Sequence, residues 1–536
     1  MSIKEKNMGG NKKKIRDKKS IWEIGETLFG GLLGLISALC VLLVLVVMPF
    51  YNREGFTHIG SDKSYFFRTA SGKMGTLLLP VIAVWGIFHV VTLIVRKEKP
   101  SRWKDLFSVQ DCFVLAYGIS CVISYFCSNY KETASWGTSG WYMGTIPQLT
   151  LVSIYFLVSR FLNRKWAEWI LYSGLAASAG TFLLGCLNRF DIWPLPMENS
   201  GRPLFISTVG NINWYCCYVV TMVFVGVGLL WLDQGRRRLR SAALCVYVFL
   251  GFCALITQGS ESGIFSMAVV LLILFLLSVF WERDQSLRRF WLILELLAGA
   301  GLFIWILCLA WPGRMNYTSG LGKLFYGPFS LLLLAVAIGG SFLPARGCRM
   351  LGKGLCILVP VTAAGFVTLI VLNTLNPGSI GALSTRKLFL FDDSWGSHRG
   401  ATWTLGLRCF SEQNPLHMLV GIGPDCMAEY LYKGASPELT EAARAAFPGK
   451  RLTNAHCELL TILVNQGLLG MITYGGIFVS LFVGFLKNRC GGLQRSLVSL
   501  ACGIGVFAYI FNNLWSFQQS LGAALVFVLL GLAALK

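Results

Sequence analysis

The residues best suited to chemistry lie in one polar interval, residues 374–466, of a chain that is otherwise a succession of apolar runs. The segment WGSHRGATW carries Arg399 near its centre, and His456 stands where the chain re-enters an apolar run. An arginine fork binds phosphate oxygens in pairs and stays charged, whereas a histidine can take a proton at neutral pH. The pair predicts a site that holds a phosphorylated donor and activates a hydroxyl group.

Three charged residues extend this candidate site. Glu458 follows His456 by two positions and could orient the imidazole or act as the base itself. Arg202, in the segment GRPLFISTVGNIN, is a second candidate for holding phosphate. Arg408, nine residues after Arg399, is a third candidate and could share its face of a helix.

Five further residues could contact a sugar or only shape the backbone. Gly421 and Gly423 in GIGPD predict a tight turn that brings backbone amides close to a ligand or to another segment, and a turn alone is the simpler interpretation. Asn211 and Asn213 open an apolar run, where amide side chains bind sugar hydroxyls or cap a helix. Trp403 would share a helical face with the arginine four residues before it, and could stack on a pyranose ring or anchor the chain at a membrane interface.

The composition indicates the class of protein. Of 536 residues, 55% are hydrophobic and 14% are charged, the mean hydropathy is +0.61, and apolar runs of membrane-spanning length recur. We therefore predict an all-α, polytopic integral membrane protein in contact with membrane lipids. The net charge of +21 is concentrated in the N-terminal tail and in short loops between apolar runs, where basic residues fix topology, so no nucleic-acid partner is expected.

The apolar runs predict about 14 transmembrane helices. The predicted division is a basic tail over residues 1–27, helices 1–11 over 28–373, the large polar loop over 374–466 and helices 12–14 over 467–536. Basic residues gather in alternate loops, as expected if the N-terminus is cytoplasmic, and an even number of helices returns the C-terminus to the same side. The large loop then lies outside.

This placement restricts the chemistry of a transfer reaction. Outside the membrane there is no ATP or nucleotide sugar, so a bond formed there needs an activated donor already carried across, most plausibly on a lipid. The chain also lacks the G-x-x-x-x-G-K-[ST] pattern of nucleotide-hydrolysing loops. The competing interpretation is structural, because interfacial arginines extend toward lipid headgroups and a histidine at a helix start can act as a cap.

The cysteines and acidic residues predict neither a disulfide framework nor a metal centre. Most of the 17 cysteines lie in apolar runs, where they are typically small buried hydrophobic residues. Cys409, Cys426 and Cys457 fall in or beside the polar loop, and a disulfide between two of them stays open. No zinc pattern occurs, and the adjacent Asp392 and Asp393 are more simply a solvated turn, so no metal or other cofactor is expected.

An ordered set of short motifs resembles one family. GNIN before an apolar run, SHRGATW, PL-x-x-x-x-GIGPD and AH-x-E-L-L ending in NQGLLG, over roughly residues 200–480, are similar as a set to the O-antigen ligase and O-antigen polymerase superfamily of bacterial envelope glycan enzymes. The resemblance implies an inner-membrane glycosyltransferase of the metal-independent GT-C type. It implies transfer of a glycan from a polyprenyl diphosphate to a glycan, lipid or protein acceptor, with Arg399 on the diphosphate and His456 on the acceptor.

Two positions depart from the family pattern. Cys457 follows the histidine, where the family usually has asparagine, and Glu261 stands in TQGSESGIF, where many ligase-like sequences carry an arginine. Arg202 or Arg314 would then have to replace that cation, or Glu261 could pair with one of them.

Two other functions also fit the sequence. A cell-wall polymerase of the shape, elongation and division group uses lipid-linked donors, but a catalytic acid is expected in its loop. A flippase or other transporter of lipid-linked glycans should show paired interrupted helices and charges along a central cavity. The few intramembrane charges and the single large loop favour the glycosyltransferase. The insert PELTEAARAAFPGK predicts a short amphipathic helix over the site.

Overall fold

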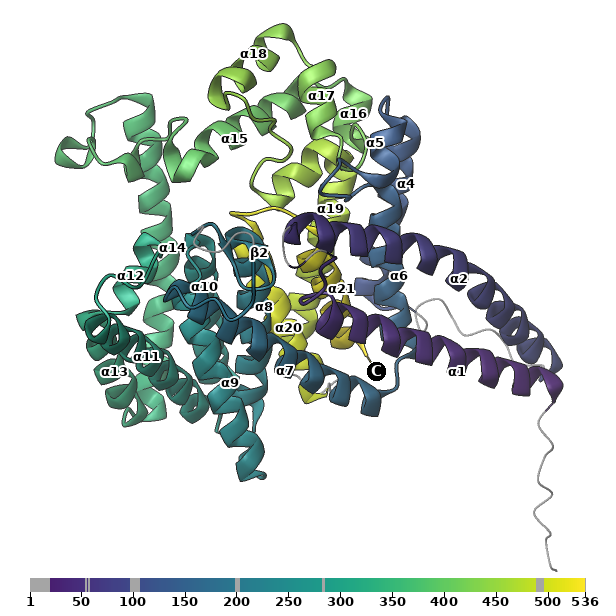
Figure 1. Ribbon diagram of the computed structural model, residues 1–536, viewed down its shortest axis with the longest axis horizontal. Helices are drawn as coiled ribbons and strands as arrows, with labels where there is room; N and C mark the ends of the chain where they lie inside the picture. The colour runs from purple at the N-terminus through teal and green to yellow at the C-terminus, as the bar shows by residue number, and fades with distance from the viewer. Residues whose placement is uncertain are drawn as a thin grey trace, which may run out of the picture.

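The computed structural model describes residues 20–53, 55, 58–96, 107–197, 203–281, 285–487 and 496–535. Within these ranges the chain is almost entirely helical, and its only strands are the paired β1 (Phe205–Ile206) and β2 (Gly210–Asn211). The helices form a bundle with a layer of short helices over one end, and α1 and α2 project from its side (Figure 1). The prediction of an all-α, multi-pass membrane protein is confirmed.

The bundle helices coincide with the predicted apolar runs. In the described part of the chain, 10 are long and apolar enough to cross a membrane. They are α1 (Ile21–Leu42) with the adjoining π-helix η1 (Leu43–Val47), α2 (Ile59–Val95), α4 (Val109–Cys127), α7 (Arg164–Arg189), α8 (Ile212–Leu232), α9 (Arg238–Thr257), α10 (Glu261–Phe280), α11 (Ser286–Ala310), α14 (Ala345–Leu375) and α19 (Glu458–Lys487). Shorter apolar helices occupy the remaining runs: α6 (Thr145–Phe161), α13 (Pro328–Ser341), α20 (Leu497–Asn513) and α21 (Ser520–Ala534).

The helix α8 lies at the centre of the bundle and is buried along its most apolar stretch. Apolar side chains surround it on all sides, which is typical of a helix enclosed by other helices. Small residues permit close contact with α20: a Cβ atom on Gly228 would lie 2.9 Å from the Cα of Ala501, and one on Gly505 would lie 3.0 Å from the carbonyl oxygen of Thr221. The bundle is therefore built outward from the α8 and α20 pair.

The polar loop forms a layer of short helices over one end of this bundle (Figure 1). After α14 the chain passes η2 (Gly381–Leu383) and η3 (Lys387–Phe389), and then forms α15 (Trp395–Ser411), α16 (Pro415–Val420), α17 (Met427–Lys433) and α18 (Pro437–Ala446). We call α15 to α18 the cap layer. The helix predicted in the PELTEAARAAFPGK insert is confirmed as α18, which Ser436 caps by accepting a hydrogen bond from Leu439 N at 3.2 Å. The cap layer has its own core, which includes Leu405 and Leu431.

The helix α19 begins earlier than the sequence predicts, at Glu458, and is interrupted at Gly467. Gly467 has φ 67° and ψ −169°, a conformation that is essentially restricted to glycine. A Cβ atom at this position would lie 2.6 Å from the amide nitrogen of Gly421. The GIGPD turn therefore packs directly on the break in α19, and the bundle and the cap layer meet there.

We expect Gly467→Ala to lower the free energy of unfolding by about 2–4 kcal/mol, because alanine at this position is strained and its Cβ atom meets the backbone of the turn. The measurement is a thermal-unfolding curve of the purified protein in detergent. Gly475→Ala is the matched control, since Gly475 lies in the same helix with open space around it and alanine there is neutral or stabilising by up to about 1 kcal/mol. Equal effects of the two substitutions would contradict the assigned role of the break.

Candidate functional site

Arg399 begins the regular part of α15. The three residues before it, Gly396, Ser397 and His398, have φ values of 57°, 59° and 68°, so the chain turns sharply into the helix. The Nε of Arg399 donates to the carbonyl oxygen of Trp515 at 2.9 Å, and Nη1 donates to that of Gly396 at 2.7 Å. Two backbone carbonyls thus fix the guanidinium.

The positive charge of Arg399 is not used in an ion pair within the described ranges. Burial lowers the pKa of its guanidinium, and the nearby Cys216 and Glu261 oppose this shift. Among the described residues, no acceptor takes a hydrogen bond from Nη2. An anionic ligand could therefore reach a fixed and partly buried cation here, where its attraction is stronger than in water.

His456 lies two residues before α19 and close to Arg399. Its backbone is left-handed, with φ 49°, and its ring packs edge-on against Phe517 with 5.1 Å between the ring centres. Burial, followed by the charge of Arg399, lowers the pKa of the imidazole to about 4. The structure therefore brings the two main predicted residues within electrostatic reach, and it holds the imidazole neutral at physiological pH.

The carboxylate of Glu458 points into the bundle rather than toward the imidazole. It accepts hydrogen bonds from the hydroxyls of Tyr474 and Tyr509, the latter at 3.1 Å, and from the amide of Asn513. The side chain is completely buried. In this geometry Glu458 ties the start of α19 to α20, and it does not contact His456 in the way that the sequence suggests.

Trp403 belongs to an aromatic cluster beside Arg399. Its ring centre lies 5.2 Å from that of Trp515 and 5.6 Å from that of Trp395. The indole nitrogens of Trp403 and Trp515 are buried without a hydrogen-bond partner. Because the carbonyl of Trp515 also holds Arg399, the cluster fixes the arginine and adds an aromatic surface next to it.

The remaining predicted polar residues lie elsewhere. Arg202 falls outside the described residues. Asn211 caps α8 by accepting a hydrogen bond from the backbone of Asn213 at 2.8 Å, which confirms the capping interpretation. Arg408 does not share the predicted face, because nine residues are two and a half helical turns and place it on the opposite side of α15. Its side chain is 42% exposed and lies 3.8 Å from Glu412.

The GIGPD turn positions a residue that the sequence analysis missed. Gly421 and Gly423 have φ values of 83° and 120°, which confirms the predicted tight turn. The turn directs Asp425 to accept hydrogen bonds from the backbone of Thr138 at 2.8 Å and of Met143 at 3.2 Å. Burial raises the pKa of Asp425 to about 7, against the effect of these two bonds. The indication in the sequence was that Asp425 is the last residue of the GIGPD motif.

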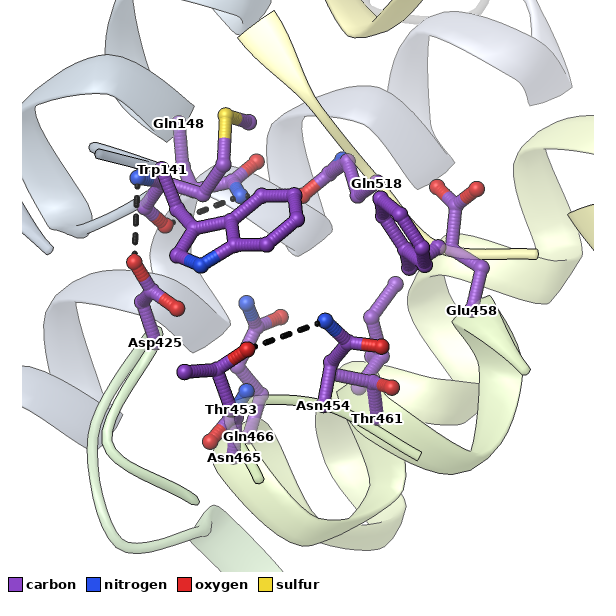
Figure 2. A pocket seen from close by; sticks show the side chains of 13 residues that line it. Trp141, Gln148, Asp425, Thr453, Asn454, Glu458, Thr461, Asn465, Gln466 and Gln518 are labelled. Carbon is purple, nitrogen blue, oxygen red and sulfur yellow. Dashed lines mark hydrogen bonds between the residues drawn. The ribbon is translucent and has the colours of Figure 1, made fainter. Parts of the chain in front are cut away.

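A small polar cavity lies next to His456, because Phe517 both lines the cavity and packs against the imidazole. Figure 2 shows the side chains that line this cavity. Its volume is about 30 Å³, which holds one or two water molecules and excludes a sugar. Its lining residues include Trp141, Gln148, Asp425, Thr453, Asn454, Glu458, Thr461, Asn465, Gln466 and Gln518. Buried oxygens of Asn465 and Gln466 have no protein partner. The cavity therefore lies beside the candidate site and is too small to hold a glycan itself.

Arg189, at the end of α7, is a buried cation that the sequence analysis did not single out. It is 1% exposed, and it donates to the carbonyl oxygens of Thr257 at 2.8 Å and Gln258 at 2.7 Å. It therefore reaches the TQGSESGIF segment, which contains Glu261. Glu261 itself accepts a hydrogen bond from Gly320 N at 3.0 Å, at the start of α12 (Gly320–Phe325). The sequence gives little indication that Arg189 is buried, because this residue lies at the end of an apolar run.

The described residues contain no group of three or more histidine, cysteine or acidic side chains placed to hold a metal ion. Cys409, Cys426 and Cys457, for which a disulfide stayed open, are free thiols. The fold and site thus define a multi-pass helical membrane protein with an arginine in the cap layer and a neutral histidine beside it. No protein-family model matches the sequence, and a search of curated proteins finds no significant match.

We expect His456 to make stability depend on pH. Its pKa of about 4 in the folded protein lies below the ordinary value of 6.5, so the unfolded chain binds more protons between these values. The free energy of unfolding therefore falls as the pH drops from 6.5 to 4, by up to about 3 kcal/mol. His456→Gln should flatten thermal stability over this range. His398→Gln, at an exposed position, is the control, and an unchanged slope in His456→Gln would contradict the assignment.

Proposed function

We propose that the protein is a membrane glycosyltransferase of the O-antigen ligase or polymerase type. It moves a glycan from a polyprenyl diphosphate to an acceptor hydroxyl at the outer face of the bacterial cytoplasmic membrane. The observation that carries this proposal is that Arg399 and His456, from separate segments of the polar loop, contact Trp515 and Phe517, which are only two residues apart. The motif resemblance implies the same two residues, and so supports the proposal independently of the geometry.

Each residue has a defined part in the proposed reaction. The acceptor oxygen attacks the anomeric carbon, and the bond from that carbon to the diphosphate oxygen breaks. The electron pair of this bond stays on the diphosphate, where the fixed charge of Arg399 stabilises it. His456 receives the proton of the acceptor hydroxyl. Because its imidazole is neutral, it is ready to accept that proton without first losing one.

The partly buried surroundings of the pair suit this division of work. Two backbone carbonyls orient Arg399, so little reorganisation is needed when charge develops on the leaving group. The aromatic cluster around Trp403 supplies a surface on which a pyranose ring of the donor can stack. Neither step requires a metal ion or another cofactor. The acceptor is a glycan, a lipid or a protein.

The proposal includes a topology. We assign the 10 long helices and the shorter α6, α13, α20 and α21 as membrane crossings, in an arrangement of the GT-C type. The shorter helices α20 and α21 are buried among other helices, and therefore need not match the full thickness of the bilayer. An even number of crossings leaves both termini in the cytoplasm, with the cap layer outside.

Transport of a lipid-linked glycan is a second candidate function, and one observation favours it. The interruption of α19 at Gly467 resembles the broken helices that form substrate sites in secondary transporters. Transporters of that kind usually carry such helices in pairs, related by an internal repeat. Transfer is therefore the function that the site supports better.

Transfer is tested with the full-length protein in proteoliposomes, with a synthetic polyprenyl-diphosphate glycan as donor. We expect Arg399→Ala and His456→Ala each to lower the transfer rate by about 100-fold or more, with donor binding retained in His456→Ala. Arg399→Lys should recover little activity, since lysine lacks the planar fork. Arg408→Gln is the matched control, because this arginine lies on the same helix but on its far side, and it should transfer at the wild-type rate.

Three outcomes would contradict the proposal. Full activity of both alanine variants would remove the roles of Arg399 and His456. Equal losses in Arg408→Gln would show that the effect is one of charge at the surface. Movement of intact donor between leaflets by the wild type, with no product on any acceptor, would establish transport instead.

A further inference from the structure

A larger cavity lies at the end of the bundle opposite to Arg399 and His456. Its volume is about 560 Å³, and its walls come from α4, α6, α7, α19, α20 and α21. The helix α19 connects the two regions, because it begins beside the candidate site at Glu458 and reaches this cavity at Lys487. The unbroken part of α19 alone, from Gly467 to the lining residues Val479 and Lys487, extends over roughly 18–30 Å at 1.5 Å per residue. The cavity is therefore no part of the transfer site.

Positive charge predominates in this cavity, which we call the basic cavity. Among the described lining residues, the cations are Arg160, Arg164 and Lys487, and the one carboxylate is that of Asp111. Asp111 is already occupied, since it accepts hydrogen bonds from Arg160 at 2.6 Å and from the hydroxyl of Tyr155 at 2.7 Å. Arg164 and Lys487 have no ion-pair partner within the described ranges. Two positive charges remain available to a ligand.

Gln110 provides a second sign of an absent ligand. Its side chain lines the basic cavity and is only 5% exposed, and its Nε2 has no hydrogen-bond partner. A buried amide donor without a partner is unfavourable, so such a group usually indicates a water, an ion or a ligand that completes it. Next to two unpaired cations, the group that best satisfies this donor is an anionic oxygen.

The walls of the basic cavity indicate which kind of molecule carries this anionic oxygen. Val479 and Val483 line it, and they are 62% and 40% exposed on the lipid-facing side of α19. A free phosphate ion gains nothing from apolar walls, whereas the acyl chains of a lipid pack against them.

We propose that the basic cavity binds the headgroup of an anionic phospholipid. The phosphodiester oxygens lie between Arg164 and Lys487 and accept a hydrogen bond from Gln110 Nε2. The acyl chains run along Val479 and Val483. Basic cavities between transmembrane helices are a recurrent setting for anionic headgroups. The site is separate from the proposed transfer function and would exist equally in a transporter.

The binding test uses native mass spectrometry of the full-length protein in detergent. The probes are phosphatidylglycerol, phosphatidylcholine with the same acyl chains, and inorganic phosphate. We expect the wild type to bind phosphatidylglycerol in preference to phosphatidylcholine. The double variant Arg164→Gln, Lys487→Gln should lose about 10- to 30-fold in affinity for phosphatidylglycerol. Arg236→Gln, Arg237→Gln is the control, because these exposed arginines follow α8 at the same end of the bundle and do not line the cavity.

A second variant distinguishes a ligand contact from a structural role. Gln110→Leu removes the unpaired donor, so we expect weaker binding of phosphatidylglycerol with no loss of thermal stability in lipid-free detergent. Equal binding of the two lipids by the wild type, or an equal loss in the control, would overturn the proposal. Displacement of phosphatidylglycerol by millimolar inorganic phosphate would show a simple anion site. A Gln110→Leu variant with lower stability and unchanged binding would remove Gln110 from the contact.

Discussion

The break in α19 is the constraint on which the site depends. A helix interrupted within a membrane protein must have its freed carbonyl groups satisfied from elsewhere. Here Gly423 N donates to the carbonyl of Asn465 at 2.9 Å, Ser124 donates to the same oxygen at 3.0 Å, and Gln413 donates to the carbonyl of Val464 at 3.1 Å. These donors come from the GIGPD turn, α4 and the end of α15. The break therefore fastens the cap layer to the bundle.

This fastening determines how the residues of the candidate site are placed. His456 lies just before the first part of α19, and Arg399 begins the regular part of α15, so fixing one helix against the other brings a cation and an imidazole together. Burial then gives each residue its useful state. The arginine keeps a charge that backbone carbonyls orient but do not neutralise, and the histidine stays neutral beside it.

The sequence predicts the helices well because membrane spans depend on local composition, and every apolar run is a helix. It also predicts Arg399 and His456 as one site, and the structure places both against the segment between α20 and α21. The sequence does not predict side-chain directions or burial that depend on contacts between residues far apart in the chain. The direction of Glu458 is set by Tyr474 and Asn513, and Arg189 becomes buried only through loops that fold over it. The start of α19 was placed too late because polar residues precede Gly467 and interrupt the apolar run.

The hydrogen bonds of Glu458 have a consequence for biogenesis. Two of its three donors, Tyr509 and Asn513, belong to α20, which is synthesised after α19. Until α20 is inserted, this carboxyl group is an incompletely bonded polar group at the start of a membrane helix, where such groups are costly. The first turns of α19 therefore settle into place only when α20 arrives. His456 stands directly before these turns, so the candidate site is completed late in synthesis, when only α21 remains to follow.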